Sequence, residues 1–349
     1  MKDEPAGPHC AINAGDGALI QLGHGGGGSL MRDLIGKIIA PAMDQASLDI
    51  ESDGAAVSLG GPAAFTTDSY VVSPLFFPGG DIGSLAVNGT VNDLAMCAAE
   101  PSYLSVSFII EEGLSIETLK RVAQSIGAAA KTAGARIATG DTKVVERGKG
   151  DGLYINTAGV GSVKAPFAPG PSRLRPGDAI ILSGDIGRHG VAVMASRAEL
   201  DFTPPIRSDC APLWDQVRAL IDAGVELHCL RDLTRGGLAA ALVEIAQSAG
   251  CEIAVDEPEI AVSEQISSAC ELLGLDPIHV ANEGRFIAVV PAEHADLAVA
   301  TLGSASAGQA RRIGETTPAH QGGRALIRSA YGVKRQIRTP KGEQLPRIC

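Results

Sequence analysis

The chain has 349 residues, which is enough for two domains that each bury a core of their own. Its formal net charge of −11 predicts no basic surface for nucleic acid or for an anionic membrane, so we expect small molecules or proteins as partners. The seven cysteines are scattered without a CxxC pair, which excludes a standard disulfide framework or a zinc knuckle.

The first ten residues, MKDEPAGPHC, are polar and acidic, and no apolar stretch approaches the length that spans a bilayer. We therefore expect no secretory signal, no membrane segment and a cytoplasmic location. Residues 1–22 contain no periodic pattern, and we expect a mobile arm there.

A glycine-rich run, GHGGGGS at 23–29, leads into a segment whose apolar residues have helical spacing. This arrangement exposes backbone N–H groups at the positive end of a helix dipole, where phosphates bind. We predict a phosphate-binding loop that includes Gly25, Gly26 and Gly27. Because the run matches neither the dinucleotide fingerprint nor the Walker pattern, a flexible linker is the alternative.

The next segments carry polar side chains in apolar surroundings. Two short β-prone runs are expected between 55 and 72, and Asp68 lies in the second of them. A carboxylate inside an apolar strand is costly unless it is paired or binds a cation. A helix that is broken or strained near Gly89 is then expected, and it carries Asn92 and Asp93. These two are either solvated capping residues or groups aimed at a metal–phosphate site.

A strand is expected at 103–110, followed by a helix at 115–134 that a serine caps and a glycine ends. The next expected strand carries Asp141 and Lys143. Side chains two positions apart on a strand point to the same face, so this spacing places a carboxylate beside an ammonium group. A simple ion pair is the alternative to a functional role. The segment DGLYINTAGVGSV predicts another strand.

The proline- and glycine-rich segment 164–177 is interpreted as a domain boundary. The second half predicts alternating strands and helices. The main ones are a strand at 178–184, a helix near 188–198, a helix at 238–250, and a closing hairpin at 324–338.

Several motifs together resemble the HypE family of carbamoyl dehydratases, which act in nickel–iron hydrogenase maturation. They are the glycine run, TTDSYVV, GTVNDLAM, TGDTKVVE, RDLTRGG, NEGRF and the terminal PRIC, and the match runs from about residue 18 to the end. The resemblance implies an α/β fold of the α+β type, with two domains and a flexible C-terminal tail. The N-terminal domains would share a β-barrel in a homodimer, and the C-terminal domain would be an α/β sandwich.

The predicted domain limits follow from this resemblance and from the boundary segment. They are 1–22 for the arm, 23–167 for the ATP-binding and dimerisation domain, 168–332 for the C-terminal domain, and 333–349 for the mobile tail that carries the last cysteine.

The resemblance implies a reaction on the chain's own Cys349. A partner carbamoyltransferase would load the thiol with a carbamoyl group, and an ATP-dependent dehydration would convert that group to a thiocyanate. The cyano group would then pass to iron on a scaffold complex. ATP phosphates need Mg²⁺, a hard cation that prefers carboxylate and water oxygens.

The resemblance also assigns roles to residues. Lys143 would neutralise the γ-phosphate or assist deprotonation, and Glu283 is the candidate general base. Asp232 and Arg235 would shape the groove that receives the tail. The candidate Mg²⁺ ligands, with Asn92 in support at the ATP site, are Asp68, Asp93 and Asp141.

The tail has a charge pattern of its own. From Tyr331 onward, five basic side chains stand against a single acidic one, so we expect attraction to an acidic body or to bound phosphates. Residues 338–349 could extend roughly 40 Å, which lets Cys349 reach a distant site. The resemblance also places the chain in an ATP-binding superfamily that includes aminoimidazole ribonucleotide synthetase and selenophosphate synthetase. Two alternatives remain open: another ATP-dependent enzyme of this superfamily that acts on a free small molecule, and an interaction protein that docks through its C-terminus.

Overall fold

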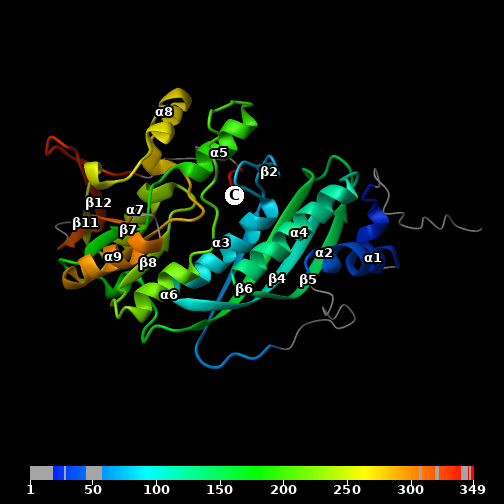
Figure 1. Cartoon of the computed structure of the whole chain (residues 1–349), viewed down its shortest axis with the longest axis horizontal. Coiled ribbons are helices and arrows are strands. Elements are labelled where there is room, and N and C mark those ends of the chain that lie inside the picture. The colour runs from blue at the N-terminus through cyan, green and yellow to red at the C-terminus, as the bar shows by residue number, and fades with distance from the viewer. Residues whose placement is uncertain are drawn as a thin grey trace, which may run out of the picture.

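The computed structural model describes residues 19–26, 29–44, 57–305, 309–318, 322–338, 345 and 347–349. These residues form two α/β halves, each built on a sheet of its own (Figure 1). The expected mixed α/β fold is therefore confirmed. Residues 1–18 of the expected mobile arm at 1–22 lie outside the described residues, as does Gly27. The end of the arm is not mobile as expected, because Ile20 is buried in the core of the first half and exchanges backbone hydrogen bonds with 113–114.

The first half is a four-stranded sheet in the order β1-β6-β4-β5. Strands β4 and β5 are parallel, and the other neighbours are antiparallel. Two helices cover one face of the sheet (Figure 1). The elements are β1 (Ala63–Tyr70), α3 (Ile82–Met96), β4 (Ala99–Glu111), α4 (Ile116–Thr132), β5 (Arg136–Val145) and β6 (Leu153–Val163).

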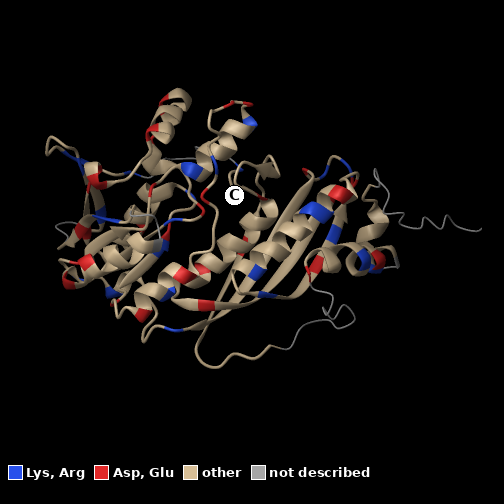
Figure 2. Cartoon of the chain, in the orientation of Figure 1, with Lys and Arg blue, Asp and Glu red and all other residues tan. Residues whose placement is uncertain are grey.

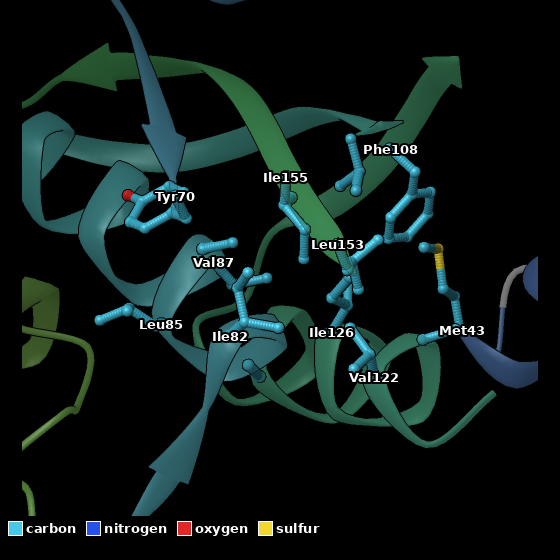
Figure 3. Close-up of a cluster of buried hydrophobic side chains, with 14 of the residues drawn as sticks. Met43, Tyr70, Ile82, Leu85, Val87, Phe108, Val122, Ile126, Leu153 and Ile155 are labelled. Atoms are coloured by element: carbon cyan, nitrogen blue, oxygen red, sulfur yellow. The ribbon is translucent and has the colours of Figure 1, made fainter. Parts of the chain in front are cut away.

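The core of this half forms because alternate strand residues point toward the helices. Figure 3 shows aliphatic side chains of α3 and α4 meeting those of β4 and β6, with Met43 and Tyr70 at the borders of the cluster. The sheet face opposite the helices keeps Phe65 71% exposed and Ile109 42% exposed. One face of the sheet is thus uncovered and keeps exposed apolar side chains, whereas the other is well packed.

Two expectations in this half are wrong. Helix α3 runs without a break through Gly89, because glycine there allows the Tyr70 ring to pack against the helix. A Cβ at Gly89 would lie 2.2 Å from the Tyr70 Oη. The first of the two β-prone runs also forms no strand over its described residues 57–59.

The second half is a seven-stranded sheet in the order β13-β12-β9-β11-β7-β10-β8. Helix α7 packs on one face, and α6 and α9 pack on the other. Helices α5 and α8 pack against each other beside the sheet (Figure 1). The strands are β7 (Ala179–Leu182), β8 (Cys229–Asp232), β9 (Glu252–Asp256), β10 (Phe286–Val290), β11 (Arg311–Thr317), β12 (Arg324–Arg328) and β13 (Lys334–Gln336).

The helices of this half are α5 (Arg188–Arg197), α6 (Trp214–Asp222), α7 (Gly237–Ala249), α8 (Glu264–Leu273) and α9 (Ala295–Ala305). The short elements of the first half are η1 (Leu22–Gly25), α1 (Ser29–Leu34), the π-helix η2 (Ile35–Ile39), α2 (Ala40–Ala42) and the hairpin β2 (Phe76–Phe77) with β3 (Gly80–Asp81). The predicted closing hairpin is confirmed as β12 and β13. Within the described residues, every helix is too short or too polar to cross a membrane.

Figure 2 shows acidic and basic residues spread over both halves.

Candidate active site

A cavity of about 220 Å³ lies where the two halves meet. Strand β1 and helix α3 line it from the first half, and the segments next to β8 and β10 line it from the second. The last residue of the chain completes the lining. Its chemically reactive side chains are Asp68, Asp93, Asp232, Arg235, Glu283 and Cys349. The fold thus gathers residues that are more than 200 positions apart in the sequence, and all six were given roles by the resemblance.

Glu283 is the most enclosed of these side chains. It is 2% exposed, and its Oε1 has no hydrogen-bond partner among the described residues. Asp209 fixes its backbone, because the two carboxylate oxygens accept from the Glu283 and Gly284 N–H groups at 3.2 and 3.1 Å. Burial, followed by the negative charges of Asp232 and Asp209, raises the pKa of Glu283 well above its usual range. Once ionised, Glu283 therefore holds an accepted proton more firmly than an exposed carboxylate does, and its side chain lines the cavity.

The other carboxyl groups repel one another. Burial raises the pKa of Asp93, the hydrogen bond from Thr66 at 2.8 Å opposes this shift, and the charge of Asp68 adds to it. Burial, with the charge of Asp93, raises the pKa of Asp232 to about 7. Such a cluster is unfavourable unless protons or cations offset its charge.

This chemistry fits a divalent cation that arrives with phosphates. Mg²⁺ commonly takes one or two protein carboxylates and fills its remaining positions with phosphate and water oxygens. Asp68 and Asp93 supply such a pair. Within the described residues there is no group of three possible ligands, so the third predicted ligand, Asp141, does not join this pair in a single chain.

Asp141 and Lys143 lie on the uncovered face of the first sheet. Their side chains are 50% and 59% exposed, whereas Thr142 between them is buried toward the helices. The Lys143 Nζ lies 2.6 Å from both Asp141 carboxylate oxygens, and its hydrogen bond lowers the pKa of Asp141. The predicted neighbouring carboxylate and ammonium are confirmed as an ion pair. Strand β5 is three strands away from β1, which corresponds to about 14 Å.

The glycine run lies beside this ion pair. Element η1 packs on β5, and a Cβ at Gly25 would lie 2.4 Å from the Val144 backbone nitrogen. Gly26 ends η1 by donating to the Gly23 carbonyl at 3.4 Å, and α1 begins at Ser29 as expected. The described part of the glycine run and Lys143 thus form a second group of predicted residues, separate from the cavity.

Asn92 has a different position from the one expected. Its side chain is buried, its amide nitrogen donates to the carbonyls of Ala211 and Glu283, and its oxygen accepts from the Leu213 N–H. The amide is therefore engaged in joining the two halves behind the cavity.

The C-terminal end is docked against the body of the chain. The Val71 N–H donates to the Cys349 carbonyl, and the Ser73 N–H donates to the Arg347 carbonyl, both at 3.2 Å. These two hydrogen bonds hold 347–349 against 71–73. Ile348 between them is 4% exposed. The end of the expected mobile tail is therefore held in place over 347–349, although these residues form no helix or strand. Backbone hydrogen bonding of this kind leaves no composition signal in the sequence.

The basic tail also contacts acidic groups of the body, in the direction that its charge predicts. Arg335 lies 3.2 Å from Glu257, and Arg347 forms an ion pair with Asp151. Several residues around the docked end were not predicted, namely His189, Arg197 and Asp209. His189 could have been identified from the sequence, because it is a histidine within a largely apolar helix.

The comparisons with known proteins cover nearly the whole chain. Residues 51–163 match the N-terminal domain of the AIR synthase related proteins, and residues 175–326 match their C-terminal domain. The carbamoyl dehydratase HypE of Cupriavidus necator is 48% identical over 335 residues, which covers 95% of each chain. The chain belongs to the HypE family of carbamoyl dehydratases. The predicted family and enzyme class are confirmed.

Other members agree. The HypE of Escherichia coli is 44% identical over 343 residues, covering 95% of this chain and 99% of that protein. A crystal structure of HypE in complex with ATP has a TM-score of 0.91 and 43% identity, and covers 94% of this chain and 99% of that one. A structure of a HypE–HypF complex has a TM-score of 0.77 and 40% identity over 90% of this chain and 100% of that one.

Proposed function

We propose that this chain uses ATP to dehydrate a carbamoyl group on its own Cys349, giving a thiocyanate. The observation that carries the proposal is the position of Cys349, which lines the same cavity as Glu283, Asp68 and Asp93. The position of a cysteine in a cavity lined by carboxyl groups supports a role as substrate carrier. The family's name and the ATP complex of a relative support the same reaction.

The reaction needs activation of a poor leaving group, the amide oxygen. In the proposed sequence the carbamoyl oxygen attacks the γ-phosphorus of ATP and ADP leaves. The nitrogen loses one proton as the C=N bond forms. The C–O bond then breaks, phosphate leaves, and loss of the second nitrogen proton completes the nitrile. The products are the thiocyanate, ADP, phosphate and one proton.

Glu283 is the proposed acceptor of the nitrogen proton. A general base must lie within hydrogen-bond reach of the proton it removes and must hold that proton firmly enough to accept it. The Oε1 of Glu283 has no partner among the described residues, and the raised pKa of Glu283 supports the second requirement. Cys349 brings the carbamoyl nitrogen to this oxygen because both residues line one cavity.

Asp68 and Asp93 are the proposed holders of Mg²⁺, which would neutralise the phosphates of ATP. Lys143, Asp141 and the glycine run are the proposed phosphate-binding group, but they lie on the other face of the sheet. A homodimer that covers the exposed apolar face around Phe65 would allow the Lys143 group of a second copy to complete the nucleotide site. This arrangement is the proposed reason for the separation of the two groups.

The proposed partners follow from the chemistry and from one relative. A carbamoyltransferase must load Cys349, and the structure of a HypE–HypF complex supports a protein partner of this kind. An iron-bearing scaffold complex would accept the cyano group. Burial of Ile348 in its own chain does not favour the alternative in which this side chain docks in a partner's groove.

The test is ADP release by loaded chain. The wild type and a Cys349→Ser variant would be incubated with carbamoyltransferase and carbamoyl phosphate, separated from nucleotides, and then given MgATP. We expect about one ADP per carbamoylated chain from the wild type and none above background from the variant. Equal ADP release from both would favour a free small-molecule substrate and contradict the proposal.

A further inference from the structure

We propose that one face of helix α5 is a receptor for the backbone of the C-terminal residues, with His189 and Arg197 as positioning residues that hold Cys349 at the cavity. The purpose of this receptor rests on the proposed function, but the docking itself can be measured without catalysis. Figure 1 shows the C-terminus beside α5 and β2, between the two halves.

His189 recognises the carbonyl of Ile348. Its side chain is 0% exposed, and its Nε2 lies 2.9 Å from that carbonyl oxygen. Its Nδ1 lies 2.9 Å from the Ser208 Oγ, which itself accepts from the Cys210 N–H at 3.0 Å. Ser208 can then donate to Nδ1, which leaves the proton on Nε2 for the tail. Burial lowers the pKa of His189, in agreement with this neutral form.

Arg197 recognises the preceding carbonyl. It lies eight residues after His189, two turns along the same helix face. Its guanidinium donates to the Arg347 carbonyl at 2.8 Å and to the Ser73 carbonyl at 2.7 Å. It therefore joins the tail to the same segment of the first half that pairs with the tail through backbone N–H groups.

The apolar part of the receptor lies between these two polar contacts. Val193 is one turn from each, and it belongs to the same buried cluster as Phe77, Ala281 and Ile348. The sequence of α5 thus presents a donor, an aliphatic side chain and a second donor at intervals of four residues. In the tail, these three groups correspond to the Ile348 carbonyl, the buried Ile348 side chain and the Arg347 carbonyl.

The docked end carries a local strain. Arg347 has a φ of +56°, the left-handed region that is unfavourable for side chains other than glycine. Its side chain offsets this by donating to the Val71 carbonyl at 3.0 Å and by pairing with Asp151. His189 contacts the Ile348 carbonyl and Arg197 contacts the Arg347 carbonyl. These contacts therefore fit the tail with or without a group on the Cys349 sulfur.

Pulsed alkylation tests the receptor. The full chain would be treated briefly with iodoacetamide, and the modification of Cys349 and of exposed Cys97 would be quantified by mass spectrometry. We expect His189→Leu and Arg197→Ala to raise the Cys349 rate about tenfold, because each removes a side-chain donor to a backbone carbonyl of the tail. His189→Gln keeps a donor at the position of Nε2, so it should restore protection. Arg218→Ala, which removes an exposed arginine on α6, is the matched control and should leave both rates unchanged.

Three results would overturn the proposal. The first is equal Cys349 rates in the wild type, His189→Leu and Arg197→Ala. The second is a parallel rise at Cys97, which indicates general loosening of the fold. The third is a His189→Gln variant that behaves like His189→Leu. If His189→Leu does not fold, Arg197→Ala and Arg218→Ala still test the proposal, because only Arg197→Ala should raise the Cys349 rate. A failure of the proposed dehydration would leave these rates unaffected.

Discussion

The side-chain amide of Asn92 on helix α3 donates a hydrogen bond to the backbone carbonyl of Glu283 at 3.2 Å. The same nitrogen donates to the Ala211 carbonyl at 3.1 Å, and its oxygen accepts from the Leu213 N–H at 2.8 Å. One buried side chain of the first half therefore fixes the loop of the second half that carries the proposed base. This explains why an asparagine occurs among small apolar residues on α3.

Replacing Asn92 by Ala should lower the free energy of unfolding by about 2 kcal/mol, because three buried backbone groups lose a partner. Dehydration should slow as well, since Glu283 is no longer fixed. Denaturant unfolding and single-turnover ADP release measure the two effects. Gln124→Ala removes an exposed amide on α4 and should change stability by less than about 0.5 kcal/mol. Equal losses of stability in the Asn92→Ala and Gln124→Ala variants would contradict the proposed role of Asn92 in joining the two halves.

Replacing Glu283 by Gln should abolish dehydration without destabilising the fold. Because the pKa of Glu283 is raised in the folded state, the folded chain binds a proton more tightly than the unfolded chain does. Its contribution to stability is thus present below the usual value of 4.5 and is lost as the pH rises through the folded pKa. At neutral pH the Glu283→Gln variant should therefore melt at the same or a higher temperature than the wild type.

The rate of dehydration in the wild type should rise with pH, with a midpoint above 4.5, because the base must be ionised to accept the proton. Single-turnover rates across the pH range would show this profile. A pH-independent rate, or an active Glu283→Gln variant, would assign the proton transfer to another group.

Much of the fold follows from local patterns. The strands with Asp68 and Lys143 and the helix capped by Ser115 have clear periodicity and caps, and all of them form as expected. Helix α6 and strands β8 and β11 were not predicted, because they are short and their apolar residues pack on partners far away in the sequence. The continuity of α3 depends on Tyr70 packing at Gly89, which is a tertiary contact.

The candidate site follows from the sequence only in part. The motifs identify Glu283, Asp93 and Cys349, and the cavity brings them together. They do not show that Asp141 faces the opposite side of the sheet from Asp68, because strand order is not encoded in spacing. Nor do they reveal the receptor on α5, whose contacts are made to backbone carbonyls.

Replacing Lys143 by Ala should remove nucleotide-dependent activity with little loss of stability. Its ion pair with Asp141 is more than half exposed, and pairs of this kind contribute about 0–1 kcal/mol. ATP binding by calorimetry and thermal melting measure the two effects. Lys164→Ala breaks an ion pair of similar exposure with Glu100 and should retain ATP binding. Full ATP binding by the Lys143→Ala variant would contradict its proposed role.

Replacing Gly25 by Ala should displace the glycine run from β5, since the new methyl group would overlap the Val144 backbone. A clash of this kind costs about 1–3 kcal/mol where the backbone must shift. We expect weaker ATP binding together with a lower melting temperature. Gly60→Ala, where a Cβ meets open space, is the control. Unchanged ATP affinity in Gly25→Ala would separate this glycine from the nucleotide site.

Mass spectrometry of the C-terminal peptide tests the proposed reaction on the chain itself. The chain would be loaded by carbamoyltransferase with carbamoyl phosphate, freed of nucleotide, and analysed before and after addition of MgATP. We predict that the Cys349 peptide first gains the mass of one carbamoyl group and then loses the mass of one water only when ATP is present. A carbamoylated peptide that keeps its mass after ATP is consumed, or a peptide that is never modified by an active transferase, would contradict the proposal.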